Sequence, residues 1–211
     1  MSASNPPSAG RERGGTLNYE YSAQNHDWDM TLYAAAELIK AGLAMDKRPR
    51  TGNMSMGFSF FTGGMVLSFA AIESFSASVA FLMPSHERFA GFDFQRYRTA
   101  RRFWDKMNML MAAAGIEIDR SNGMFQHMGQ MQEWRNLVTH ASPYEIEPTE
   151  IENTTGAPGK LHQRKRRLEY LRIADPENAK RFYGTALAFI NLVTERTGID
   201  PRASATYKQL A

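Results

Sequence analysis

Residues 57–83, GFSFFTGGMVLSFAAIESFSASVAFLM, constrain the fold more than any other part of the chain. As a helix, this run is long enough to cross a bilayer. However, it contains one charge (Glu73), several serines and the pair Gly63-Gly64, and neither flank is decisively basic. A buried central helix, with small residues that permit close packing, explains these features better than a membrane span does. We therefore expect a helical core built around this segment, and no membrane partner.

The overall composition is typical of a globular cytoplasmic protein. The chain has 211 residues, of which 43% are hydrophobic and 22% charged, so it can form one domain with a sizeable core. It has no cysteine, which excludes disulfides, thiolate metal sites and cysteine nucleophiles. Its net charge of +3 permits an acidic partner such as nucleic acid without requiring one.

Apolar residues at helical spacing and the positions of Gly and Pro predict the remaining elements. Besides the central segment, we expect helices at about 26–45, 94–114, 121–141 and 176–196. Residues 17–22 alternate enough for a short strand, and residues 144–173 contain two extended pieces around a Gly/Pro turn. The predicted fold class is all-α, a bundle of about five helices with a small β-hairpin-like insertion. We expect a single domain over 17–200, a disordered tail at 1–16 without a signal peptide, and a second tail at 201–211.

The segment WRNLVTH, residues 134–140, places Arg135, Asn136 and His140 together on the predicted 121–141 helix. Arg135 falls within an apolar stripe, which we expect to consist of Met124, Met128, Met131 and Val138. Glu133, Asn136 and His140 form a second stripe at i, i+3 and i+7. An Arg on an apolar seam is costly unless it is paired, and its candidate partners are Glu73 and the anion of a ligand. Without a ligand, Arg135 would be a structural strut and His140 a helix-end cap.

The segment RNLVTH resembles the signature of HEPN domains (higher eukaryotes and prokaryotes nucleotide-binding). That signature is an Arg, four to six residues and a His, often with Asn directly after the Arg. The surroundings agree, because the motif lies late in a long helix of an all-helical bundle. A small-residue helix containing a Glu precedes it, and a closing helix follows. The resemblance covers roughly residues 27–197.

The resemblance implies a metal-independent endoribonuclease without a cofactor, which dimerises so that two motif copies form one composite site. It implies that His140 performs acid–base chemistry on the ribose 2′-hydroxyl and that Arg135 holds the scissile phosphate. Asn136 would orient His140 or bind phosphate, and Glu73, Glu133 and Thr139 would support them. Many members act in toxin–antitoxin or anti-phage systems, which implies an antitoxin or defence partner. Others have lost activity and bind nucleotides, RNA or proteins, and this remains the alternative.

The chemistry is reasonable for these residue types. RNA carries its own nucleophile in the 2′-hydroxyl, and His titrates near neutral pH, as a general base must. Arg offers a planar, permanently charged fork for the phosphoryl oxygens. One position departs from the family: in toxins inactivated by nucleotidyltransferase antitoxins, a Tyr stands two residues after the His. Here that residue is Ser142, and the nearest Tyr is Tyr144, so control by tyrosine adenylylation is not expected.

Two basic groups and three other residues complete the set of candidates. Arg164, Lys165, Arg166 and Arg167 either follow an RNA backbone or form a solvated hairpin edge. Arg98, Arg101 and Arg102 are expected on one solvated face of the 94–114 helix. His26, Asp27 and His127 lack the spacing of metal ligands, so we expect them at the surface and predict no metal site.

Overall fold

The computed structural model describes residues 19–24, 26–46, 57–139, 173–202 and 204–209, and the chain divides into two compact units. One unit comprises His26–Arg202, and the other comprises the two chain ends, Met1–Asn25 and Ala203–Ala211. Each unit is described by itself.

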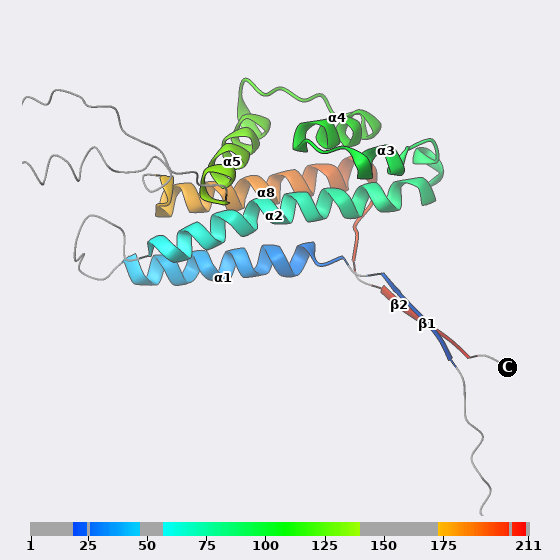
Figure 1. Cartoon of the computed structure of the whole chain (residues 1–211), viewed down its shortest axis with the longest axis horizontal. Coiled ribbons are helices and arrows are strands. Elements are labelled where there is room, and N and C mark those ends of the chain that lie inside the picture. Colours follow the sequence, from blue (N-terminus) through cyan, green and yellow to red (C-terminus); the bar gives the residue numbers. More distant parts are fainter. Residues whose placement is uncertain (1–18, 25, 47–56, 140–172, 203, 210–211) are drawn as a thin grey trace, which may run out of the picture. The chain divides into compact units, whose positions relative to one another are not determined.

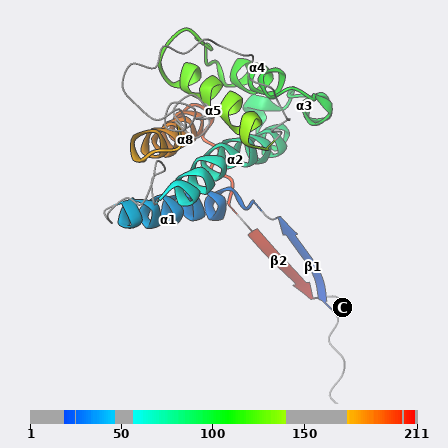
Figure 2. The same ribbon diagram turned by 60° about the vertical axis from the view of Figure 1, so that its left-hand side comes forward.

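All regular elements that the structure describes within the unit His26–Arg202 are helical, which confirms the all-α expectation for these residues. The helices are α1 (Trp28–Asp46), α2 (Phe58–Leu82), α3 (Phe94–Thr99), α4 (Phe103–Ala114), α5 (Gly123–Thr139) and α8 (Pro176–Thr197). Two short 3-10 turns, η1 (Met83–Ser85) and η2 (Glu87–Phe89), connect α2 to α3. Figure 1 shows α1 and α8 running alongside α2, while α3, α4 and α5 lie across it, and Figure 2 shows the same arrangement from another side.

Helix α2 is the central helix, as the sequence predicts. Fully buried side chains are spread along the helix, among them Phe61, Phe69, Phe75 and Val79. Together with η1 it forms the one helical stretch of the described chain that is long and apolar enough to cross a membrane. Within the most apolar 18 residues of this stretch, 56% are buried inside the bundle.

Small residues bring α1 and α2 close together. A Cβ atom added at Gly64 would lie 2.6 Å from Ile39 Cγ1 and 3.1 Å from the backbone oxygen of Ala35. On α1, a Cβ atom added at Gly42 would overlap the ring of Phe61. The absence of side chains at these two positions is therefore what permits the contact between the two helices.

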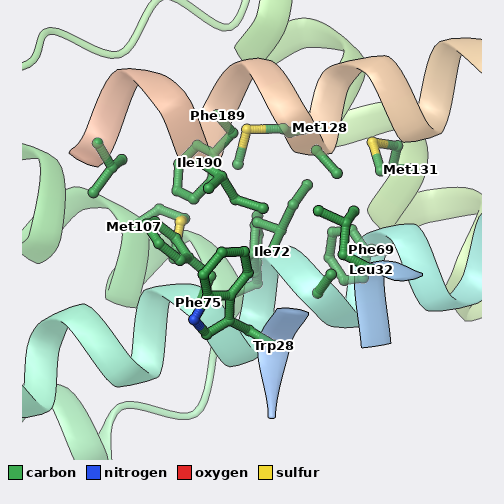
Figure 3. Close-up of a cluster of buried hydrophobic side chains, with 14 of the residues drawn as sticks. Trp28, Leu32, Phe69, Ile72, Phe75, Met107, Met128, Met131, Phe189 and Ile190 are labelled. Carbon is green, nitrogen blue, oxygen red and sulfur yellow. The ribbon is translucent and has the colours of Figure 1, made fainter. Parts of the chain in front are cut away.

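The core is an aromatic cluster that joins the helices across α2 (Figure 3). The Phe75 ring meets Trp28 of α1 edge-on at 5.1 Å between centroids, and Phe189 of α8 at 6.3 Å. Met107, Met128 and other side chains from α4 and α5 pack into the same cluster. One residue of α2 thus links the two helices that run alongside it.

The predicted 94–114 helix is wrong as one element, because the chain is extended between α3 and α4. Ala100 has φ −62° and ψ 130°, and Arg102 has φ −91° and ψ 138°. On a continuous α-helix, Tyr97 and Phe103 would lie about 240° apart around the axis. Both are buried in the structure, at 2% and 8% exposed, which the break allows. The described helices therefore number six rather than five.

The boundaries of the last helix are confirmed. The Asp175 carboxylate accepts a hydrogen bond from the Asn178 amide at 2.8 Å, and Pro176 follows as the first helical residue. Gly198 ends the helix in the left-handed conformation, with φ 73°. Gly115 ends α4 in the same way, with φ 68°.

The other unit contains a two-stranded antiparallel ladder. β1 (Tyr19–Gln24) pairs with β2 (Ser204–Gln209), and Tyr21 lies opposite Tyr207. A strand was predicted at 17–22, close to β1, but 204–209 was expected to be tail, which is wrong. The predicted tail at 1–16 lies outside the described residues, as does the predicted insertion at 144–173 apart from Ile173.

Replacing Phe75 with Ala should lower the free energy of unfolding by about 3–5 kcal/mol, because a fully buried ring would leave a cavity between three helices. Urea denaturation followed by circular dichroism measures this change. Phe81, on the same helix but 46% exposed, is the matched control. Phe81→Ala should cost less than about 1.5 kcal/mol. Equal losses for the two variants would contradict this account of the core.

Candidate functional site

Helix α5 is anchored to the bundle by Phe125, Met128, Met131 and Trp134, which are its buried residues. The Trp134 ring meets Phe182 of α8 edge-on at 5.6 Å. The predicted stripe is therefore partly wrong, because Met124 and Val138 are only half-buried. The large apolar residues at i, i+3, i+6 and i+9 were the signal for the true face, and this face leaves Arg135 at its edge.

Arg135 forms a bidentate ion pair with Glu73 of α2, which confirms the partner expected from the sequence. Its Nη2 donates to both carboxylate oxygens, at 2.7 and 2.9 Å. The two side chains are 24% and 40% exposed, respectively, so the pair lies at the surface of the bundle rather than in its core. The desolvation cost of the pair is correspondingly smaller than that of a fully buried one.

Two further contacts fix the Arg135 guanidinium. It lies over the Phe69 ring, with Cζ 5.1 Å from the centroid, in a cation–π arrangement. Its Nη1 donates to Oδ1 of Asn136 at 3.1 Å. Because Phe69 and Glu73 are one turn apart on α2, they support the guanidinium from the same helix face.

The fixed guanidinium keeps donors for another ligand. An arginine side chain carries five N–H groups. The contacts found for Arg135 within the described residues involve only Nη2 and one hydrogen of Nη1. Its Nε–H and second Nη1–H have no acceptor within the described residues, and the neighbouring Asn136 is exposed.

Sequence reasoning missed Tyr97, which lies on α3 and is 2% exposed. Burial, and then the negative charge of Glu73, raise the pKa of the Tyr97 phenol above its ordinary value. The phenol therefore stays protonated at physiological pH, and no second negative charge develops beside Glu73. No local pattern indicated this neighbour, because α3 and α2 meet only through the tertiary fold.

Of the other predicted site residues, Glu133 and Thr139 make no side-chain contact with the pair. Glu133 is exposed, and no contact joins it to Arg135. The Thr139 hydroxyl donates to the Arg135 backbone carbonyl at 2.9 Å, which is a bond within the helix. His140 directly follows the last residue of α5 and lies outside the described residues, as do Arg164, Lys165, Arg166 and Arg167.

The predicted surface position of His26 is wrong. His26 is 6% exposed, its ring is 6.2 Å from that of Phe81, and its Nε2 has no hydrogen-bond partner among the described residues. His127 is half-buried, whereas Asp27 is exposed. Within the described ranges, no three His, Asp or Glu side chains come together as metal ligands would.

A double-mutant cycle with Glu73→Gln and Arg135→Met should show that the pair contributes to stability. We expect each single variant to lose about 1–2 kcal/mol of unfolding free energy, because each leaves a half-buried partner without its bidentate bond. The coupling energy should be about 1 kcal/mol and should shrink in high salt. Thermal or urea unfolding of the four proteins measures it. Strictly additive losses would mean that the two side chains are energetically independent.

No model of a known protein family matches this chain, and neither does any curated protein or solved structure with which it was compared. The resemblance of RNLVTH to the HEPN signature therefore stays a prediction.

Proposed function

We propose that this protein is a metal-independent endoribonuclease of the HEPN type, with Arg135, Asn136 and His140 as its catalytic residues. One observation carries the proposal: the Arg135 guanidinium is fixed by Glu73, Phe69 and Asn136, yet two of its N–H groups have no acceptor among the described residues. A phosphodiester fits such a group, because its oxygens accept two hydrogen bonds from one arginine fork.

In this reaction the ribose 2′-hydroxyl attacks the adjacent phosphorus while a general base removes its proton. Negative charge builds up on the non-bridging oxygens, where Arg135 stabilises it. The bond to the 5′-oxygen breaks, and a general acid donates a proton to that oxygen. The products are a 2′,3′-cyclic phosphate and a 5′-hydroxyl. His140, directly after α5, is the residue that we assign to proton transfer.

A complete site requires a second copy of the chain, because one motif supplies only one Arg and one His. We propose a two-fold symmetric homodimer through the end of α5, since two-fold interfaces place the same residues opposite each other. Leu137 supports this assignment. It is 48% exposed, directly after Asn136, and is one of four large hydrophobic side chains that the described part of the chain leaves exposed.

The same family resemblance supports a role in the cytoplasm as a toxin or anti-phage effector, held in check by an antitoxin or defence partner. The second candidate is a catalytically silent domain that binds nucleotide, RNA or a protein. One observation favours it: Arg135 Nη2 donates to both carboxylate oxygens of Glu73, as in a structural strut. Cleavage assays separate the two candidates.

RNA cleavage should proceed in excess EDTA and should leave 2′,3′-cyclic phosphate and 5′-hydroxyl ends, because the substrate supplies the nucleophile. DNA, and RNA methylated at the 2′-oxygen of the cleavage site, should remain intact. Mass spectrometry of the fragments identifies the ends. His140→Ala should lower the rate by about two to four orders of magnitude, as expected for loss of a general acid or base. A magnesium requirement or 5′-phosphate ends would overturn this mechanism.

Leu137→Glu should dissociate the dimer and abolish cleavage, because two like charges would face each other at a symmetric contact. Size-exclusion chromatography with light scattering at micromolar concentration gives the mass. Met30→Glu is the control, since Met30 is also an exposed large hydrophobic residue, at 65%, but lies on α1. It should leave both the dimer and the activity unchanged. A wild-type protein that is monomeric and active would refute the composite site.

A further inference from the structure

Four arginines gather where α3 meets α4. Arg96 and Arg98 lie on α3, and Arg101 and Arg102 lie on the extended link before α4. We call these four residues the arginine corner. All four side chains are exposed, and none forms an ion pair with any residue of the described chain.

The folding of this segment separates its charges from its core contacts. Tyr97, between Arg96 and Arg98, is buried, and so is Phe103, directly after Arg102. These aromatic side chains hold the segment on α2, while the arginines extend into solvent. The break at Ala100 changes the backbone direction between the two pairs, so the arginines are not restricted to one helix face.

Two chains of contacts connect the arginine corner to the candidate site. The Phe103 ring is 4.9 Å from Phe69, whose ring lies beneath the Arg135 guanidinium. On the other side, Tyr97 is close enough to Glu73 for the carboxylate to raise the pKa of its phenol. The arginine corner is therefore next to the Glu73–Arg135 pair, although α3 and α5 are far apart in sequence.

We propose that the arginine corner binds the phosphodiester backbone of single-stranded RNA on one side of the bond that is cut at Arg135. This proposal rests on the proposed function and adds the surface that holds the substrate. Arginine suits the task because its planar fork contacts phosphate oxygens in pairs and is always charged. Unpaired arginines also attract the strand over a distance and release its counterions on contact.

The surroundings favour a nucleic acid over a membrane. Surfaces that bind anionic lipid usually combine basic residues with apolar side chains that enter the bilayer. At the arginine corner Tyr97 and Phe103 are buried, and Phe94 and Trp104 are half-buried. The exposed large hydrophobics of the described chain, Met30, Tyr33, Phe81 and Leu137, belong to other helices, and only Phe81 contacts α3, through the ring of Phe94.

The test measures binding separately from cleavage. The probe is a fluorescein-labelled RNA 20-mer with every 2′-oxygen methylated, which the proposed reaction cannot cut. The corner variant changes all four arginines to Gln (Arg96→Gln, Arg98→Gln, Arg101→Gln and Arg102→Gln). Its Kd from fluorescence anisotropy at 100 mM salt should rise at least tenfold. The slope of log Kd against log salt should fall by about 3, since each contact to a single strand contributes about 0.7.

The control variant removes the same charge elsewhere, with Lys40→Gln, Lys180→Gln, Arg181→Gln and Arg202→Gln, all at exposed positions. It should bind the probe within about threefold of the wild type and keep the salt slope. A corner variant with four Lys substitutions should recover the slope and much of the affinity, which excludes misfolding as the cause. Wild-type affinity of the Gln corner variant, or an equal loss in the control, would overturn the proposal. So would a corner variant that loses binding to phosphatidylserine vesicles but keeps binding to RNA.

Cleavable RNA distinguishes this inference from the proposed function. Corner-dependent binding by a protein that never cleaves RNA would refute the ribonuclease and support the corner as a nucleic-acid surface. Cleavage with unchanged KM in the Gln corner variant would refute the corner and leave the ribonuclease intact. If both are right, KM rises while kcat changes little, because the contacts lie away from the reacting atoms.

Discussion

Helix α2 carries a single charged residue and has buried residues along most of its length, and the other helices of the bundle pack against it. Helices α1 and α8 run alongside it, and α3, α4 and α5 lie across it (Figure 1). Its one charged residue, Glu73, cannot be buried without a partner at acceptable cost. The bundle meets this constraint by leaving the carboxylate 40% exposed and bringing Arg135 against it from α5. The position of the candidate site thus follows from the packing of the central helix.

In the function that we propose, the Glu73–Arg135 pair serves stability and chemistry through different atoms of one guanidinium. Nη2 bonds to the carboxylate, and the ring of Phe69 supports the planar group from below. The remaining donors have no acceptor within the described residues. A purely structural pair requires only an opposite charge at this position, which Lys also supplies. Phosphate binding requires the fork as well, because only a planar group with several N–H donors can bind Glu73 and a second anion together.

The sequence was most informative where neighbouring residues decide the structure, or where an unpaired charge would be too costly to bury. Asp175, Pro176 and Gly198 marked the last helix because caps are decided by neighbouring residues. The partner of Arg135 could be predicted because Glu73 is the single charge of an apolar helix. The break before Phe103 could not, since RTARRF contains neither Gly nor Pro and only the tertiary burial of two aromatic residues requires it. The pairing of β1 with β2 joins opposite ends of the chain, which no local pattern encodes.

The break between α3 and α4 also changes how the arginines around it are placed and how we interpret them. On one continuous helix, Arg98, Arg101 and Arg102 would be an ordinary solvated face, with Asp105 available one turn beyond Arg101. In the structure, buried aromatics and exposed arginines alternate in sequence, and Arg101 is not paired with Asp105. The stability of the segment therefore depends on Tyr97 and Phe103, while its arginines form no ion pair with the described residues. Surface charge without a structural role, next to a fixed guanidinium, is consistent with selection for a polyanionic ligand.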